Sequence, residues 1–288
     1  MDANIKNILV SHGLAPSKKR GQNFLKHRAT AQAIITQASF SENDHIVEVG
    51  VGLGALTLCL ARSVLQVTGI EIDRGIVQYH EQERILPGNV ELIHQDVLKT
   101  DFSALHNKIG TPLKIISNLP YSISNPFIFK LIDNRSAIDQ VVILLQKEMA
   151  DRLMAKPHSK EYGIPTILLQ SCADVVGLMK VGAAEFNPRP KVDSLLIRIM
   201  FDHHKIPESL FGWLRNMVRA SFSSRRKTVV NNLLASFPFP EGVTLTKPMK
   251  RKLIGEALEK TGLRGDIRAE DISIQEFKQL AEYMQDLG

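Results

Sequence analysis

The chain has 288 residues, which is enough for one domain of about 200 residues and a second, smaller one. Its hydrophobic fraction of 44% is ordinary for a globular protein, and no apolar run approaches the ~18 residues needed to span a membrane. The net charge of +6 and the pI near 9.3 favour a polyanionic partner, with nucleic acid as the leading candidate.

Cysteine use and the start of the chain indicate the compartment. Cys59 and Cys172 lie in apolar surroundings without a CxxC pair or a neighbouring histidine, so we expect both to be reduced core residues. Residues 1–10 lack the apolar core of a signal peptide. Together these features predict a cytoplasmic protein.

The first two thirds of the chain alternate between strand and helix patterns. A short helix is expected over residues 3–13, then a basic loop over 16–21 and a helix ending near Ala38. The strands expected after it are residues 45–49, 66–72, 90–94, 114–117, 140–146, 173–181 and 195–201, and the helices among them are 55–63, 74–84 and 126–132. This alternation predicts an α/β fold with a doubly wound, mostly parallel, seven-stranded sheet, in which the last two strands could form an antiparallel edge.

After Phe201 the pattern changes. Residues 202–207 are typical of a linker, and apolar residues then recur at helical spacing from Glu208 onward. Further helices are expected at 250–261 and 273–285. We therefore expect two domains, residues 1–205 and a small all-helical C-terminal domain of residues 206–288.

A glycine-rich turn joins the first strand of the sheet to its helix. Gly50, Gly52 and Gly54 have GxGxG spacing, not the GxGxxG spacing of dinucleotide-binding loops. Glu71 ends the next strand, where a carboxylate can bind both ribose hydroxyls, and Asp96 follows the third, where it can accept from an adenine amino group. Singly, each acid could be a solvated loop residue. Jointly they predict an adenosine pocket without a pyrophosphate site, which favours S-adenosylmethionine over NAD.

The tetrapeptide Asn118-Leu119-Pro120-Tyr121 follows the fourth strand. The Asn118 amide oxygen and the Leu119 carbonyl can accept hydrogen bonds from one NH2 group, and the Tyr121 ring can stack on the base that carries it. Pro120 would fix both acceptors in place. By itself the tetrapeptide is equally consistent with an ordinary strand-end turn.

Basic residues gather in three groups. One includes Lys18, Lys19 and Arg20, the second includes Arg225, Arg226 and Lys227, and the third spans residues 247–252. Each group could be a solvated surface, but three of them in one basic chain favour RNA phosphate contacts.

Motifs along nearly the whole chain resemble the ribosomal RNA adenine dimethyltransferases of the KsgA type. The motifs that carry the resemblance are residues 21–25 (GQNFL), 48–57, 71–73, 95–96, 118–121, 145–148 (LQKE), 186–194 (FNPRPKVDS) and 225–228 (RRKT). Arg20 and Arg189 depart from the residues usual in that family. The resemblance implies a Rossmann-like methyltransferase domain that uses S-adenosylmethionine, with a helical rRNA-binding domain after it.

The resemblance also implies roles for individual residues. Asn23, Leu25, Gly50, Glu71, Asp96 and Asn118 match the positions that hold the cofactor. Asn118, the Leu119 carbonyl and Tyr121 match those that position the target amine, and Phe186 matches an aromatic that packs on the target adenine. Because Phe186 precedes the proline-rich stretch 187–190, we expect it to escape burial within an element.

The expected activity is N6 dimethylation of two adjacent adenosines in a hairpin loop near the 3′ end of 16S rRNA. The expected partner is the 30S subunit or its precursor, with a role in small-subunit biogenesis, and the protein is expected to be a monomer. Two alternatives remain. One is a 23S rRNA methylase that confers macrolide resistance, and the other is a non-catalytic assembly or transcription factor on the same fold.

Overall fold

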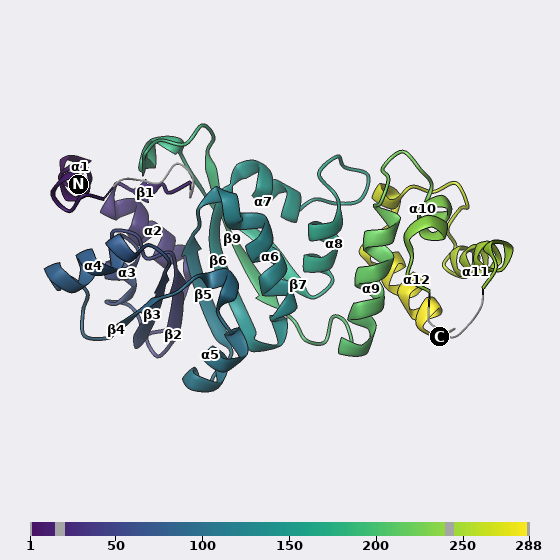
Figure 1. Cartoon of the computed structure of the whole chain (residues 1–288), viewed down its shortest axis with the longest axis horizontal. Helices are drawn as coiled ribbons and strands as arrows, with labels where there is room; N and C mark the ends of the chain where they lie inside the picture. Colours follow the sequence, from purple (N-terminus) through teal and green to yellow (C-terminus); the bar gives the residue numbers. More distant parts are fainter. Residues whose placement is uncertain (1, 15–20, 240–244, 287–288) are drawn as a thin grey trace. The chain divides into compact units, whose positions relative to one another are not determined.

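The computed structural model describes residues 2–14, 21–239 and 245–286 (Figure 1). The chain divides into two compact units. The sheet unit comprises residues 1–150 and 174–201, and the helical unit comprises residues 151–173 and 202–288. Residues 151–173 and 202–205 were expected in the first domain but belong to the helical unit. Contacts within that unit account for the longer of the two segments. Residues 151–173 join the helical unit because the Tyr162 hydroxyl donates to the Ile272 carbonyl (3.1 Å) and His158 pairs with Asp271 (2.9 Å).

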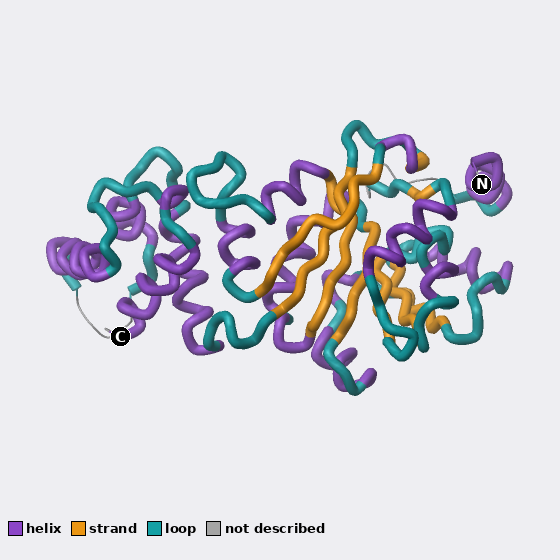
Figure 2. The backbone as a smooth tube through the Cα atoms, turned by 180° about the vertical axis from the view of Figure 1, so that it is seen from behind, coloured by secondary structure: helices purple, strands orange, loops and turns teal. Residues whose placement is uncertain are grey.

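A seven-stranded sheet is the centre of the sheet unit, and Figure 2 shows its strands side by side in orange. The strands are β2 (His45–Val49), β3 (Gln66–Glu71), β4 (Val90–His94), β5 (Leu113–Asn118), β6 (Ile138–Gln146), β7 (Ala173–Val181) and β9 (Ser194–Phe201). Their order is β4-β3-β2-β5-β6-β9-β7; the first five are mutually parallel, and β9 runs antiparallel to β6. The predicted fold class is therefore confirmed.

The helices along the sheet unit are α1 (Asp2–Ser11), α2 (Arg28–Ala38), α3 (Thr57–Leu60), α4 (Arg74–Glu83), α5 (Phe102–Ile109), α6 (Ser124–Asp133) and α7 (Lys147–Leu153). The short 3-10 turns of this unit are η1 (Val97–Lys99), η2 (Tyr121–Ile123), η3 (Arg135–Ala137) and η4 (Ala183–Glu185), and η5 (Ala269–Asp271) belongs to the helical unit. The helix expected over 55–63 is only α3, because the glycine turn before it takes positive φ at Gly52 and Gly54. Helix α5 was not expected, although Asp101 caps its start and Gly110 ends it.

The core forms because adjacent residues of a strand face opposite sides of the sheet. Ile46 and Ile116 pack with α2 and α3 residues such as Ile34 and Leu60, and all four are fully buried. Their neighbours Val47 and Ile115 face the other side and are equally buried. Burial on both faces explains the nearly continuous apolar runs of these strands, and it leaves their carboxyl ends as the place where polar residues gather.

A two-stranded ribbon joins two distant segments of the sheet unit. Strand β1 (Phe24–Leu25) pairs antiparallel with β8 (Phe186–Asn187), so that Leu25 lies opposite Phe186. The Lys26 amide extends the ribbon by donating to the Glu185 carbonyl (2.9 Å). The ribbon thus brings the GQNFL segment beside the segment that precedes the proline-rich loop.

The helical unit contains α8 (Ile164–Gln170), α9 (Glu208–Ser221), α10 (Val229–Ser236), α11 (Lys247–Lys260) and α12 (Ile274–Asp286). Helix α9 packs against α8, α10 and α12 (Figure 1). Helices α8 and α10 were not expected. The start of α10 has a clear cap. Its first turn is capped by the Thr228 side chain, which accepts from the Asn231 amide. Within the described ranges, no helix is both long and apolar enough to cross a membrane.

Candidate active site

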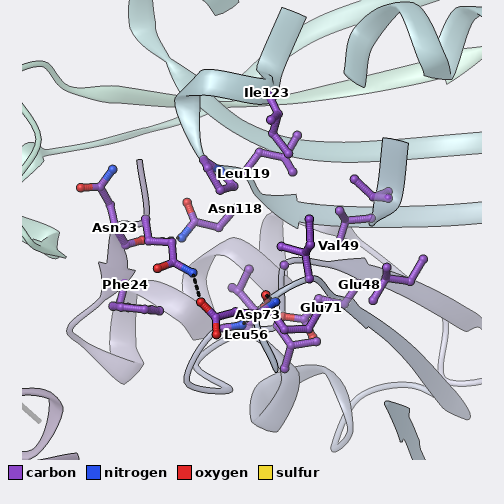
Figure 3. Close-up of a pocket in the computed structure, with 18 of the residues that line it drawn as sticks. Asn23, Phe24, Glu48, Val49, Leu56, Glu71, Asp73, Asn118, Leu119 and Ile123 are labelled. Atoms are coloured by element: carbon purple, nitrogen blue, oxygen red, sulfur yellow. Dashed lines mark hydrogen bonds between the residues drawn. The ribbon is translucent and has the colours of Figure 1, made fainter. Parts of the chain in front are cut away.

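A cavity of about 640 Å³ opens at the carboxyl ends of β2, β3 and β5, beside the segment that follows β4. In open α/β sheets this rim is the usual place for a ligand. Eight of the predicted site residues line it, namely Asn23, Leu25, Gly50, Glu71, Asp96, Asn118, Leu119 and Pro120. Figure 3 shows Asn23 and Phe24 on one side of this pocket, near both Asn118 and Asp73.

The glycine turn forms the floor of the cavity and is held from several sides. Gly50 and Gly52 have φ of 78° and 55°, a region that other residues adopt only with strain. The Gly52 amide donates to Glu71 Oε2 (3.0 Å), and its carbonyl accepts from His80 Nε2 (2.7 Å). A Cβ at Gly52 would lie 3.2 Å from the Phe24 ring. A ligand can approach the backbone at Gly50 instead, where a Cβ would meet only the Asn118 carbonyl oxygen, at 3.9 Å.

Glu71 is buried at the end of β3. One carboxylate oxygen accepts from Gly52, and the other accepts from the Asp73 amide (2.8 Å). Burial raises the pKa of this carboxyl, and the two backbone hydrogen bonds oppose that rise. Each oxygen retains a lone pair that can accept a ribose hydroxyl, so the site fits an adenosine.

Asp96 is partly exposed and lies on the adjacent part of the rim. Its Oδ1 accepts from the Leu98 amide (2.9 Å) and so caps η1, which fixes the direction of the carboxylate. Because a carboxylate has two oxygens, this bond leaves acceptor capacity toward the cavity. Its contact with an adenine amino group remains a prediction.

Glu48, which belongs to the 48–57 motif and for which no role in the site was expected, also lines the cavity. It is 1% exposed, and among the described residues neither carboxyl oxygen has a hydrogen-bond partner. Burial raises the pKa of Glu48 to about 8, Thr57 beside it opposes part of the rise, and the charge of Glu71 adds to it. An acidic residue inside an apolar strand was the sequence signal for this group.

Asn118 ends β5 and is oriented by the segment opposite. Its Nδ2 donates one of its two hydrogens to the Asn23 carbonyl (3.1 Å), which fixes the orientation of the amide and leaves Oδ1 as an acceptor. The Asn23 side chain in turn donates to the Gly21 carbonyl (3.0 Å). These two bonds orient the Asn118 side chain so that its Oδ1 can accept a hydrogen bond from an amine.

Residues Gln22–Leu25, here called the strap, lie along the cavity from Asn118 to the end of β3. Gln22 Nε2 donates to Asp73 Oδ2 (3.4 Å), the bond drawn as a dashed line in Figure 3. The Phe24 ring lies against the Gly52 backbone. The strap therefore brings cofactor-binding candidates from the GQNFL motif to the same cavity as the strand ends.

Tyr121 does not line this cavity. It is half-buried in η2, and its hydroxyl hydrogen-bonds with Ser194 Oγ at the start of β9 (3.0 Å). Burial raises the pKa of the Tyr121 hydroxyl, and the bond to Ser194 opposes the rise. The hydroxyl is therefore neutral at physiological pH.

The expectation that Phe186 escapes burial is wrong. Phe186 is 2% exposed and packs in the core with Leu25, Leu56 and Leu196, because pairing of β8 with β1 turns its ring inward. It does not line the cavity. A contact between this ring and a target base stays a prediction.

The basic residues fall into two cases. Lys18, Lys19 and Arg20 lie outside the described residues. Arg225, Arg226 and Lys227 are exposed in the turn between α9 and α10, in the helical unit, and Arg225 donates to the Lys160 carbonyl (3.3 Å). Their binding to RNA stays a prediction.

Known proteins share both the sequence and the fold. The family model described as ribosomal RNA adenine dimethylase matches residues 15–286. A protein of Desulfotalea psychrophila named ribosomal RNA small subunit methyltransferase A is 51% identical, over 94% of this chain and 92% of that protein. One of the same name from Syntrophus aciditrophicus is 36% identical over 96% of both chains.

Two solved structures show the same fold. A dimethyladenosine transferase from Plasmodium falciparum is 25% identical, with a TM-score of 0.73 over 89% of this chain and 95% of that one. The 23S rRNA methyltransferase ErmE has a TM-score of 0.66 at 23% identity, over 91% of this chain and 100% of that one, which shows the fold alone. Together, the family match, the two relatives and the sheet-end cavity identify the chain as an S-adenosylmethionine-dependent methyltransferase that belongs to the ribosomal RNA adenine dimethylase family.

Proposed function

We propose that this protein dimethylates N6 of two adjacent adenosines in a hairpin loop near the 3′ end of 16S rRNA, within the 30S subunit or its precursor. The names of the two bacterial relatives favour the small subunit over the 23S rRNA. The ribosomal substrate is also consistent with the expected cytoplasmic location. We further propose that the protein acts as a monomer and contributes to small-subunit biogenesis by binding this particle.

The orientation of Asn118 carries the proposal. S-adenosylmethionine would supply the methyl group as an electrophilic sulfonium and leave as the neutral thioether, and the methylated nitrogen would then release its proton. The lone pair of an adenine amine is delocalised into the ring, so the amine is a poor nucleophile. Acceptance of its hydrogens by Asn118 Oδ1 and the Leu119 carbonyl would draw the nitrogen toward tetrahedral geometry and make the lone pair available. Asn118 is held for this role by its bond to the Asn23 carbonyl.

The other rim residues have matching roles. Asn23, Leu25 and the Gly50 backbone would contact the cofactor, with Glu71 on its ribose and Asp96 on its adenine. The target base must leave its stack, and stacking on Tyr121 would recover ~1–3 kcal/mol. Lys18, Lys19, Arg20, Arg225, Arg226 and Lys227 would bind rRNA phosphates, and we propose residues 206–288 as the main rRNA-binding domain.

Replacement of Asn118 tests the proposal. We expect Asn118→Ala to abolish methylation while binding to the small subunit is retained, because the change removes an acceptor and no basic group. Asn43→Ala, at an exposed turn, is the matched control and should be fully active. The measurement is primer extension across small-subunit rRNA from cells that lack the protein and are complemented with each variant.

The expected pattern is a pair of reverse-transcription stops at adjacent adenosines that disappears without the protein. Wild type and Asn43→Ala should restore the stops, and Asn118→Ala should not. An unchanged small-subunit pattern together with altered stops in 23S rRNA would instead support the large-subunit alternative. Restored stops with Asn118→Ala would remove Asn118 from the mechanism.

A further inference from the structure

The backbone and the hydroxyl of Tyr121 are each fixed by a specific neighbour. Pro120 fixes the chain just before it, with φ of −56°, and η2 contains no buried residue. Among the described residues no aromatic ring or cation packs on the phenol, and the polar contact of its hydroxyl is the bond to Ser194. Within this half-buried side chain, the bond to Ser194 is therefore the polar contact that fixes the direction of the ring.

Ser194 is a rigid anchor for that hydroxyl. It is 1% exposed and is the first residue of β9, opposite Gln146 at the end of β6. The preceding residue, Asp193, is held twice: its carbonyl accepts from the Lys147 amide (3.0 Å), and its Oδ1 accepts from the Ala183 amide (2.9 Å). The Ser194 hydroxyl thus has a position set by the sheet and by the segment before β8.

We propose that Ser194 is a positioning residue for methyl transfer, which fixes the plane of the Tyr121 ring through the hydrogen bond between their hydroxyls. A tyrosine has only two side-chain torsions, so a tether at its hydroxyl together with a fixed backbone leaves one ring orientation. A base stacked on that ring then presents its amine at a defined angle to Asn118, which matters because small misplacements slow transfer strongly. The inference rests on the proposed role of Tyr121 as the stacking residue.

A double-mutant cycle tests it. Tyr121→Phe and Ser194→Ala each delete the hydrogen bond, and Tyr121→Phe keeps the ring. We expect each to lower the single-turnover methylation rate of unmethylated small subunits by roughly three- to tenfold, the range of one hydrogen bond. We expect the double variant to be no slower than either single variant, because the same bond is lost in all three.

Two further measurements separate positioning from general damage. The dissociation constant for S-adenosylmethionine, measured by calorimetry without RNA, should be unchanged because neither residue lines the cavity. Ser171→Ala also deletes a fully buried serine hydroxyl, which donates to the Leu168 carbonyl (2.8 Å), but it does not touch Tyr121 and should leave the rate unchanged. If Ser194→Ala fails to fold, Tyr121→Phe alone decides, since a wild-type rate in that variant overturns the inference.

Other outcomes are equally decisive. Effects of the two single variants that multiply in the double variant would mean that Ser194 does not act through Tyr121, which overturns the inference. Wild-type rates in both single variants would overturn it too. Tyr121→Ala distinguishes the underlying proposal: if it is fully active, Tyr121 has no stacking role, whereas an inactive Tyr121→Ala beside a fully active Tyr121→Phe refutes only the part played by Ser194.

Discussion

At the residue scale, Glu48 shows how much the surroundings decide the chemistry of a side chain. A buried carboxyl is costly to ionise, and burial accordingly raises the pKa of Glu48 to about 8, although Thr57 opposes part of the rise. In the folded protein it therefore holds a proton at neutral pH that the unfolded chain releases. Folding stability is linked to pH through this group.

The sign of that linkage gives a prediction. Between its ordinary value of 4.5 and about 8, the folded state binds the proton and the unfolded state does not, so the contribution of Glu48 to stability falls as pH rises. Glu48→Gln removes this dependence. We compare the free energy of unfolding of Glu48→Gln with that of wild type. We expect this difference to shift in favour of Glu48→Gln by an amount on the order of 3 kcal/mol between about pH 5 and about pH 7.5.

Urea unfolding at the two pH values measures this difference. Glu42→Gln, which removes an exposed carboxyl, is the matched control and should run parallel to wild type. A Glu48→Gln variant whose advantage is the same at both pH values would show that Glu48 is ionised in the folded protein.

At the element scale, the glycine turn between β2 and α3 owes its shape to backbone that other residues avoid. Gly52 has φ of 55° and a Phe24 ring carbon 3.2 Å from the position of a Cβ. An alanine at this position would be strained by its left-handed backbone, and its Cβ would crowd the Phe24 ring of the strap. The close packing of the strap on the turn therefore requires glycine at position 52.

We predict that Gly52→Ala lowers the thermal midpoint, by the equivalent of about 1–2 kcal/mol, and weakens S-adenosylmethionine binding. Calorimetric titration and thermal unfolding with and without the cofactor measure both effects. Gly88→Ala is the matched control, since a Cβ there meets nothing within 4 Å and its backbone is not left-handed. Unchanged cofactor affinity in Gly52→Ala would show that the Phe24 ring can move aside and that the turn does not contact the cofactor closely.

At the scale of the whole molecule, the excess of positive charge concerns binding more than folding. The turn from Arg225 to Lys227 exposes three cations in the helical unit. Exposed cations of this kind stabilise a fold little, whereas each phosphate that they neutralise releases counterions.

Replacing Arg225, Arg226 and Lys227 together by alanine should therefore weaken rRNA binding and reduce its dependence on salt. We expect the slope of log affinity against log salt concentration to become shallower by about 2–3, while the thermal midpoint stays near that of wild type. Filter binding of small-subunit rRNA over a range of salt concentrations gives the slope. Lys108→Ala, which removes an exposed lysine paired with Glu91 (2.7 Å), is the control. An unaltered slope in the triple variant would place the phosphate contacts elsewhere.

Local pattern was sufficient for much of this molecule. The seven strands of the large sheet and the helices α4, α6, α9, α11 and α12 follow from hydrophobic periodicity, because a buried strand and an amphipathic helix each repeat at their own interval. Helices α5 and α10 were missed although Asp101 and Thr228 cap them, since short helices show too few turns for a clear period. The strand β8 was missed because two residues make no pattern at all.

The sequence by itself determined the chemistry of the rim. Glycines, Glu71, Asp96 and Asn118 follow successive parallel strands, and the carboxyl ends of parallel strands meet at one edge of a sheet. Only the tertiary structure decided which way the neighbouring groups face. It buries Phe186, ties Gln22 to Asp73 and joins Tyr121 to Ser194. The bonded residues Gln22 and Asp73 are 51 positions apart in the sequence, and Tyr121 and Ser194 are 73 apart. Leu25 and Phe186, which pair across the ribbon, are farther apart still. No local sequence pattern predicts such contacts, because they depend on the order of the strands in the whole sheet.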